Sequence, residues 1–191
     1  MTRVASTRTA VVTGRTAVAS RATIPVIQNL CPVSEQFDNA AWTKFGGITV
    51  APNTADVTDP NGGSTADKFT YDGTGAAGGA RLAQAIIVEP HRATAYTGGI
   101  HGRTLTGTRQ LSLSINVGTT VLIMLTTAWQ RFSLSSPTDI DGRILTVTVL
   151  GDGIDNSAGD WYFWGASLNN SNRLSGYATG VVNTGRIRGT P

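Results

Sequence analysis

Residues that could perform catalysis are few in this chain and are poorly placed for it. The two histidines, His91 and His101, lie ten residues apart in a glycine-rich, polar stretch, and Glu89 is the only acid close to them. Nucleophilic catalysis needs a nucleophile beside a base that a third group orients, and this stretch predicts no such triad. The sequence therefore indicates a protein that is not an enzyme.

Two acidic loops are candidates for calcium binding. Asp139 and Asp141 lie in "TDIDG", and Asp152 and Asp155 lie in "GDGIDNSAGD". A calcium ion needs about six to eight oxygen ligands, and both loops lack the terminal glutamate of an EF-hand. Turns in which Asp and Asn side chains bond their own backbone explain these residues more simply. We expect neither a metal nor another cofactor.

Aromatic side chains near amides suggest a different chemistry, the binding of a sugar. Such a site needs an exposed ring that stacks on the apolar face of the sugar, with amide, carboxylate or arginine groups for the hydroxyls. The candidates for this role are Trp42, Tyr71, Trp164, Asn169 and Asn170.

Four consecutive aromatic residues stand in the segment "DWYFWGASLNN", residues 160–170. In a β-strand, Trp161 and Phe163 would share one face, and Tyr162 and Trp164 would share the other. One surface therefore cannot hold all four rings, and at least one pair must face the core. The outward pair is either a second part of the core or a binding platform.

The elements that must position these residues have the pattern of β-strands. Charged residues make up 14% of the 191 residues, below the usual value of about 25%, and the chain contains 23 glycines. The segment "RQLSLSINVG", residues 109–118, alternates strictly between apolar and polar residues, as a half-buried antiparallel strand does. Similar runs recur without helical periodicity, which predicts an all-β sandwich or jelly roll.

The beginning of the chain differs from the rest. Residues 1–24 contain four arginines but no acidic and no aromatic residue, a composition that cannot build its own core. The repeat of "RTAVV" and "RTAVA" at a spacing of seven suggests a heptad, but Thr, Val and an intervening glycine favour an extended arm over residues 1–28. Such an arm would lay its valines along the sheet edge of a neighbouring subunit. Its anchoring residues would be Arg3, Arg8, Arg15, Arg21, Val11 and Val18; a tail without a partner is the alternative.

Several classes of protein are disfavoured by composition. Cys31 is the only cysteine, so a disulfide framework is excluded and a small buried apolar residue is expected there. The longest apolar stretch, residues 121–125, is far too short for a membrane span, and no apolar segment of a signal peptide follows the first arginines. The net charge of +3 is modest and the arginines are spread along the chain, so neither a membrane nor a nucleic acid is an expected partner.

Four blocks of the sequence together carry a resemblance to a known family. They are "NLCPVSEQFDNAAWTKFGGITVAPN" (29–53), "DPNGGSTADKFT" (59–70), "WQRFSLS" (129–135) and "WYFWGASLNNSNRLSGYATG" (161–180). In order and spacing, residues 29–180 resemble the lectin-like, carbohydrate-binding-module-like β-sandwich domain that recurs in tailed-phage virion proteins. The chain departs from the family pattern at Ser167, Asn169 and Asn170, where Gln and Glu are usual.

The resemblance implies an all-β jelly-roll β-sandwich of two antiparallel sheets, which we expect over residues 29–191. It also implies a place on the surface of a virion that is assembled in the host cytoplasm. We expect a non-enzymatic capsid decoration or cement protein, bound through its arm to the major capsid protein or other virion subunits, and a homo-oligomer such as a trimer. The alternative is a tail- or head-fibre receptor-binding module that binds host-surface glycans. An accessory module of a glycan hydrolase is disfavoured because no catalytic segment accompanies it. Trp42 and Trp161 fall inside the blocks that define the fold, so we expect both in the core.

Overall fold

The computed structural model of the chain describes residues 29–75, 80–86, 96–115, 119–136, 143–148 and 156–169. The predicted arm and the calcium-loop aspartates lie outside these ranges, as do His91 and Asn170. The arm residues outside them are Arg3, Arg8, Arg15, Arg21, Val11 and Val18.

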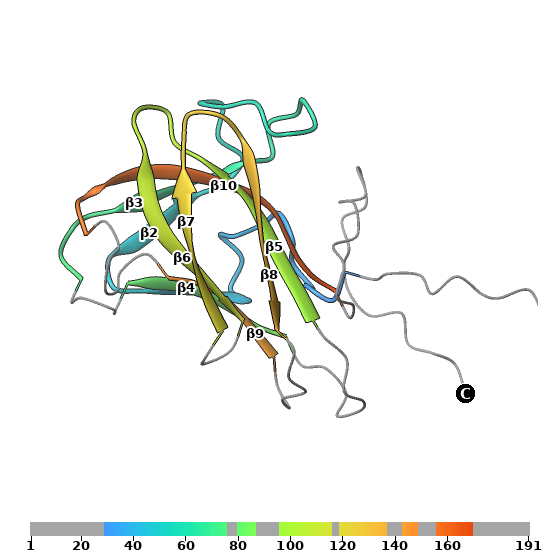
Figure 1. Cartoon of the computed structure of the whole chain (residues 1–191). Helices are drawn as coiled ribbons and strands as arrows, with labels where there is room; N and C mark the ends of the chain where they lie inside the picture. Colours follow the sequence, from blue (N-terminus) through green and yellow to red (C-terminus); the bar gives the residue numbers. More distant parts are fainter. Residues whose placement is uncertain are drawn as a thin grey trace, which may run out of the picture.

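Ten strands form two five-stranded sheets in which every described pairing is antiparallel (Figure 1). The first sheet has the order β1 (Trp42–Phe45), β4 (Arg81–Ile86), β9 (Arg143–Thr148), β6 (Arg109–Ile115) and β7 (Thr119–Leu125). The second has the order β2 (Ile48–Ala51), β3 (Asp67–Tyr71), β10 (Gly159–Asn169), β5 (Tyr96–Arg103) and β8 (Gln130–Ser136). The predicted all-β jelly-roll sandwich is confirmed. Within the described ranges, no helix is long and apolar enough to cross a membrane.

The alternating pattern of β6 directs its apolar and its polar side chains to opposite faces of the sheet. The sequence predicts a half-buried strand, but both faces are buried, since Ser112 and Ser114 are only 4% and 9% exposed. Leu111, Leu113 and Ile115 belong to the core between the sheets and have no exposed surface. Ser112 and Ser114 point to the opposite face, where β6 lies between β9 and β7. This strand therefore has the orientation that its sequence predicts.

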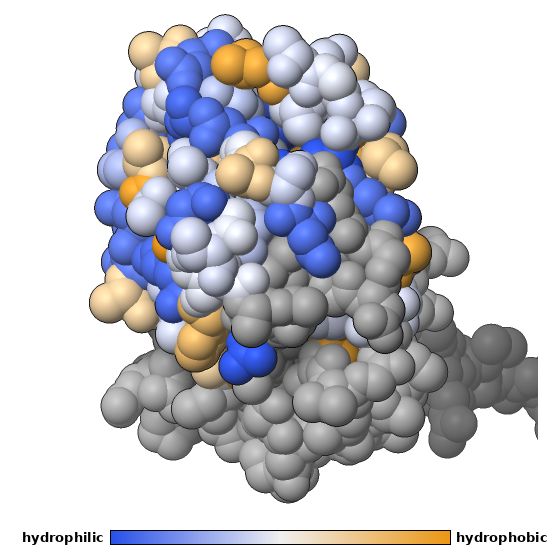
Figure 2. Space-filling view, turned by 90° about the vertical axis from the view of Figure 1, so that its left-hand side faces the viewer, coloured by the Kyte–Doolittle hydropathy of each residue, from blue (hydrophilic) through white to orange (hydrophobic). Residues whose placement is uncertain are grey.

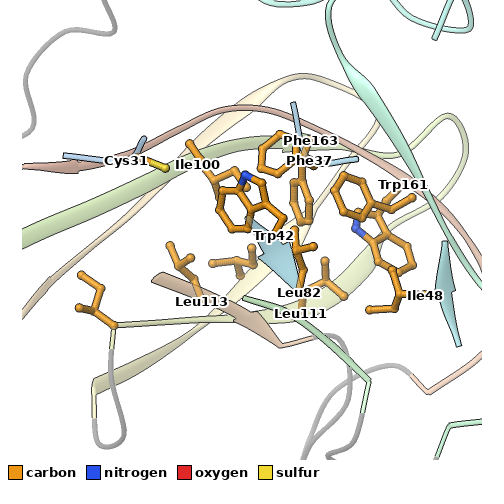
Figure 3. Close-up of a cluster of buried hydrophobic side chains, with 14 of the residues drawn as sticks. Cys31, Phe37, Trp42, Ile48, Leu82, Ile100, Leu111, Leu113, Trp161 and Phe163 are labelled. Atoms are coloured by element: carbon orange, nitrogen blue, oxygen red, sulfur yellow. The ribbon is translucent and has the colours of Figure 1, made fainter. Parts of the chain in front are cut away.

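An aromatic cluster fills the space between the sheets (Figure 3). The Phe69 ring lies 5.0 Å from that of Phe163 and stacks at 6.0 Å on that of Trp161. The ring of Phe37 lies 4.9 Å from that of Trp42, whose indole N–H donates a hydrogen bond to the Val33 carbonyl at 2.8 Å. Trp42 and Trp161 are thus core residues, as expected from their position in the sequence blocks.

The single cysteine belongs to the same core. Cys31 has no exposed surface, and its thiol donates a hydrogen bond to Gln84 Oε1 at 2.6 Å. Burial raises the pKa of this thiol to about 12. Cys31 is therefore the buried residue that the sequence predicts, and its thiol stays protonated near neutral pH.

On one of its two sides, the second half of β10 pairs with a different segment from the first half. The register of β10 against β5 shifts between Trp164 and Ser167, next to Gly165 with a φ of +63°. Residues 29–34 then lie beside β10: Leu30 N–H donates to the Leu168 carbonyl at 2.7 Å, and Ala166 N–H donates to the Ser34 carbonyl at 2.8 Å. Residues 29–34 thus extend the second sheet beside the end of β10.

The buried carboxylate of Asp67 holds the segment before β1 against the rest of the fold. Asp67 accepts hydrogen bonds from Phe37 N–H at 2.7 Å and from Asn53 N–H at 2.9 Å. Asn53 has a φ of +50°, a conformation that Asn tolerates better than most residues. Burial raises the pKa of Asp67 to about 6, and the negative charge of Asp38 adds to this, although the two backbone bonds act in the opposite direction.

We therefore expect a pH dependence of stability that originates at Asp67. Because the pKa rises from 3.8 to about 6 on folding, its contribution is full below pH 3.8 and is lost as the pH rises through about 6. Asp67→Asn does not titrate, so its free energy of unfolding should fall less than that of the wild type between these two pH values. Urea unfolding across this range measures the difference between the two profiles, with Asp72→Asn, at an exposed carboxyl, as the control. Parallel profiles for wild type and Asp67→Asn would contradict the assignment.

Candidate functional site

Four of the five residues that the sequence suggests for sugar binding are buried. The exposed fractions of Trp42, Tyr71, Trp164 and Asn169 are 1, 1, 2 and 0%. Trp42 and Tyr71 face the space between the sheets, whereas Trp164 is covered on the outer side of the second sheet. Sugar stacking needs an exposed ring, and the structure corrects the expectation that these side chains supply one.

Tyr162 and Trp164, the outward pair of β10, lie under the loop that joins β2 to β3. Both rings pack against Val57 and Ala66 of this loop. The Tyr162 hydroxyl donates to Asp56 Oδ2 at 3.0 Å, and the Trp164 indole N–H donates to Thr65 Oγ1 at 2.8 Å. All four consecutive rings are therefore buried, two between the sheets and two beneath the loop.

Asp59 holds the covering loop in its conformation. Its carboxylate accepts bonds from the backbone N–H groups of Asn61, Gly63 and Thr65 at 2.8, 3.0 and 3.0 Å, and from the Thr65 hydroxyl at 2.9 Å. Burial acts to raise the pKa of Asp59, but these bonds outweigh it and hold the pKa below its ordinary value. A Cβ at Gly63 would lie 2.8 Å from Asp59 Oδ2, so only glycine fits there without a shift of the carboxylate. The segment "DPNGG", residues 59–63, thus stabilises the loop through the hydrogen bonds of its own aspartate.

A charged group lies on the same outer face, beside the loop. Lys68 Nζ lies 2.9 Å from Asp160 Oδ2 and 3.4 Å from Asp56 Oδ2. Burial and the bond to Asp56 raise the pKa of Tyr162 to about 12, so its hydroxyl remains a donor. The carboxylates are exposed, and such pairs contribute little to stability. Among the residues that the structure describes, no three His, Cys, Asp or Glu side chains form a group that could hold a metal ion.

His101 belongs to this layer and has a packing role. Its ring lies edge-on to that of Trp164, with 5.2 Å between the centroids. Burial, aided by the positive charge of Arg131, lowers the pKa of His101 to about 4. His101 is therefore neutral near pH 7, and its ring packs edge-on against Trp164.

Trp129 supplies the exposed ring surface that the predicted residues do not. It lies between β7 and β8 and is partly exposed, and its ring packs against the edge of the covered cluster of Tyr162 and Trp164. The indole N–H donates to the Thr58 carbonyl at 2.7 Å, which fixes the ring against the covering loop. The Arg103 guanidinium lies 5.9 Å from the ring centroid.

The loops around Trp129 meet at one end of the sandwich (Figure 1). The β2–β3 loop, the β5–β6 turn and the β7–β8 turn lie together in the upper part of this view. Thr104 N–H donates to the Thr126 carbonyl at 2.8 Å and so joins the two turns. Leu105 of the β5–β6 turn is 47% exposed. The Trp129 ring is therefore held by contacts with two other segments of the chain.

We call this arrangement the Trp129 site: Trp129, Arg103 and Thr58. It combines an aromatic ring with a cation, groups that can stack on a sugar and bind its hydroxyls. Arg103 donates through Nε to the Thr104 carbonyl at 3.2 Å, and a guanidinium carries further N–H donors. Gln130 follows Trp129 in the chain and is exposed, and its Oε1 accepts a hydrogen bond from the Thr126 hydroxyl at 3.4 Å. Trp129 lies in the sequence block "WQRFSLS", but it is not among the residues that the sequence suggests for sugar binding. Its place directly after the turn residues "TTA" was the available signal, because the first residues of a strand lie at the sheet end and have fewer neighbours.

Other exposed apolar side chains of the described residues lie on the outer face of the first sheet. They are Phe45, with Arg81 4.3 Å from its ring centroid, Leu122 and Met124. The coloured part of the face in Figure 2 is mostly blue or pale, with hydrophobic residues as separate spots. An aromatic ring fixed by a hydrogen bond beside a cation is therefore the distinguishing feature of the Trp129 site.

Comparison with known proteins relates the chain to carbohydrate-binding modules. No family model matches the sequence, and no curated protein is similar to it. Among solved structures, TmCBM61 in complex with β-1,4-galactotriose is similar with 21% identity and a TM-score of 0.53 over 74% of this chain and 97% of that one. The CBM22-1 xylan-binding domain of Paenibacillus barcinonensis Xyn10C is similar with 12% identity and a TM-score of 0.53 over 77% of this chain and 97% of that one. The tailspike protein 4 of bacteriophage CBA120 matches with 18% identity and a TM-score of 0.48, over 71% of this chain and 20% of that one. The chain therefore has the β-sandwich fold of carbohydrate-binding modules.

We expect the covering loop to depend on the Asp59 carboxylate. Asp59→Ala leaves four donors without their acceptor and should lower the free energy of unfolding by about 2 kcal/mol. The Trp fluorescence of the folded protein should shift to longer wavelength, because Trp164 becomes accessible to water. Asp72→Ala is the matched control: this exposed side chain also accepts backbone and hydroxyl bonds, both from Thr74, but it holds no buried ring. Equal losses of stability in the two variants, with unchanged emission in both, would contradict the role of Asp59.

Proposed function

We propose that this chain is a non-catalytic glycan-binding β-sandwich module that binds sugar at the Trp129 site. One observation carries the proposal. Of the four tryptophans, all of which the structure describes, Trp129 alone is partly exposed, and its ring is held beside a guanidinium. The apolar face of a sugar ring stacks on an aromatic ring, and arginine and amide groups bind its hydroxyls.

The hydrogen bond from Trp129 to Thr58 supports this assignment. A ring that is already ordered loses little conformational freedom when a ligand stacks on it, which favours affinity. Asp59 adds to this order, since it fixes the loop that carries the Thr58 carbonyl. The site is therefore preorganised by contacts that do not involve the ligand.

The ligands of two similar structures indicate the class of ligand that we propose for this chain. TmCBM61 was solved with β-1,4-galactotriose, and the CBM22-1 domain is a xylan-binding domain. Both are built on the same fold as this chain. We infer that this chain binds a polysaccharide or an oligosaccharide, through hydroxyl groups that Arg103 can reach.

Trp129→Ala should abolish most of this binding. Loss of the stacking surface should weaken the affinity for a glycan selected on an array by about tenfold or more, equivalent to about 1.4 kcal/mol. Isothermal titration measures the change, and circular dichroism and urea unfolding verify that the variant is folded.

The matched control is Phe45→Ala, since Phe45 is also an exposed aromatic residue beside an arginine but lies on the other sheet. Unchanged affinity in this variant, together with weakened affinity in Trp129→Ala and Arg103→Ala, supports the proposal. Equal affinity of wild type and Trp129→Ala would refute it. Trp164→Ala is unsuitable as a binding variant, because it removes a buried ring.

We also propose a place on the surface of a phage virion, in a tail or head fibre, where the module would bind host-surface glycans. The support is the resemblance of the four sequence blocks to virion domains. The interpretation as a capsid decoration protein depends on the arm, residues 1–28, which lie outside the described residues, and stays a prediction. A reconstruction of the virion that locates the chain on the tail or on the head distinguishes the two places.

A further inference from the structure

β7 is an edge strand of the first sheet and is unusually open to pairing. Its seven residues pair with β6 in one continuous antiparallel register, from Arg109 opposite Leu125 to Ile115 opposite Thr119. Among the described strands, none pairs with its other side. The backbone N–H and C=O groups on that side are directed away from the sheet.

This strand lacks the features that usually protect an edge. Its sequence, "TTVLIML", contains no charged residue and no proline, and its pairing with β6 shows no bulge. The other edge strands differ: β1 and β2 have only four residues each, and β8 contains Arg131. A long, uncharged and regular edge favours the addition of another strand.

The side chains of β7 are also incompletely covered. Leu122 and Met124 point outward and are 52% and 46% exposed, whereas Ile123 and Leu125 belong to the core. Val121 packs against the core and is only partly buried. Both faces of β7 therefore offer apolar surface at the edge.

We propose that β7 pairs with β7 of a second copy of this chain, antiparallel and around a two-fold axis at Leu122. Leu122 is the central residue of Thr119–Leu125, so it would lie opposite Leu122 of the other copy. Thr120 then lies opposite Met124 on the outer face, and Val121 opposite Ile123 on the inner face. The pairing joins the two first sheets into one continuous sheet and extends both cores across the axis.

The strand is self-complementary in this register, which favours a second copy as the partner. Each large outward side chain meets a leucine or a threonine, and on the inner face Val121 meets Ile123 while Leu125 meets Thr119. No like charges approach each other, since the strand carries none. The alternative partner for the edge of β7 is a strand formed by residues 8–12, "RTAVV". Such a strand would bring Arg8 to an edge that has no acidic residue.

The register is tested in the full chain with Leu122→Cys. Residues directly opposite each other in antiparallel strands have Cβ atoms about 5 Å apart, close to the reach of a disulfide. We expect a disulfide-linked dimer on mild oxidation, with the 122–122 bridge identified by mass spectrometry. Leu105→Cys is the control, because Leu105 is equally exposed but lies in a turn. Cys31 is buried with a raised pKa and should not react.

The strength of association is tested with Leu122→Lys, which places two like charges on the axis. Sedimentation equilibrium should show a dimer for the wild type and for Leu105→Lys, and a dissociation constant at least about tenfold higher for Leu122→Lys. Circular dichroism verifies that both variants are folded. A wild type that stays monomeric, or a dimer that Leu122→Lys leaves unchanged, overturns the proposal. Formation of a disulfide from Leu122→Cys to a cysteine introduced in the arm, Val11→Cys, in place of the 122–122 bridge would assign the edge to the arm and overturn the proposal as well.

Discussion

The alternation of side chains along β10 is the constraint on which the rest of the structure depends. A strand directs consecutive residues to opposite faces of its sheet, so four consecutive rings require cover on both faces. The other sheet covers Trp161 and Phe163, and the β2–β3 loop covers Tyr162 and Trp164. A sandwich with only one packed face per sheet would leave two large rings in water.

This second layer of cover explains the local sequence of the β2–β3 loop. A loop lies over a sheet without regular backbone hydrogen bonds, so its own polar groups need other partners. Asp59 supplies them from within the loop, and Gly63 leaves the space that the carboxylate requires. Asp67 holds the next part of the chain in the same way, through Phe37 and Asn53. The two buried carboxylates thus stabilise segments that strand pairing alone would not fix.

Local patterns predicted the parts of the fold that depend on neighbouring residues. The alternation over residues 109–115 predicted the orientation of β6. Contacts between distant segments could not be predicted in this way. Tyr162 and Asp56 are 106 residues apart, and Trp164 and Thr65 are 99 apart, so the sequence left open whether the outward rings were covered. Asn169, which lies opposite Asn29 in an isolated bridge, became a buried residue for the same reason.

The proposed pairing of β7 determines how two Trp129 sites would be arranged. In an antiparallel pair, the Leu125 end of one β7 lies beside the Thr119 end of the other. Trp129 follows Leu125 by four residues, after the β7–β8 turn, so the two rings would lie at opposite ends of the joined sheet. Two sites that point in opposite directions cannot bind neighbouring sugars of one short chain, and simultaneous binding needs two ligands or a long one. A dimer of this geometry would therefore increase avidity by bridging separate glycan chains or distant parts of one long chain.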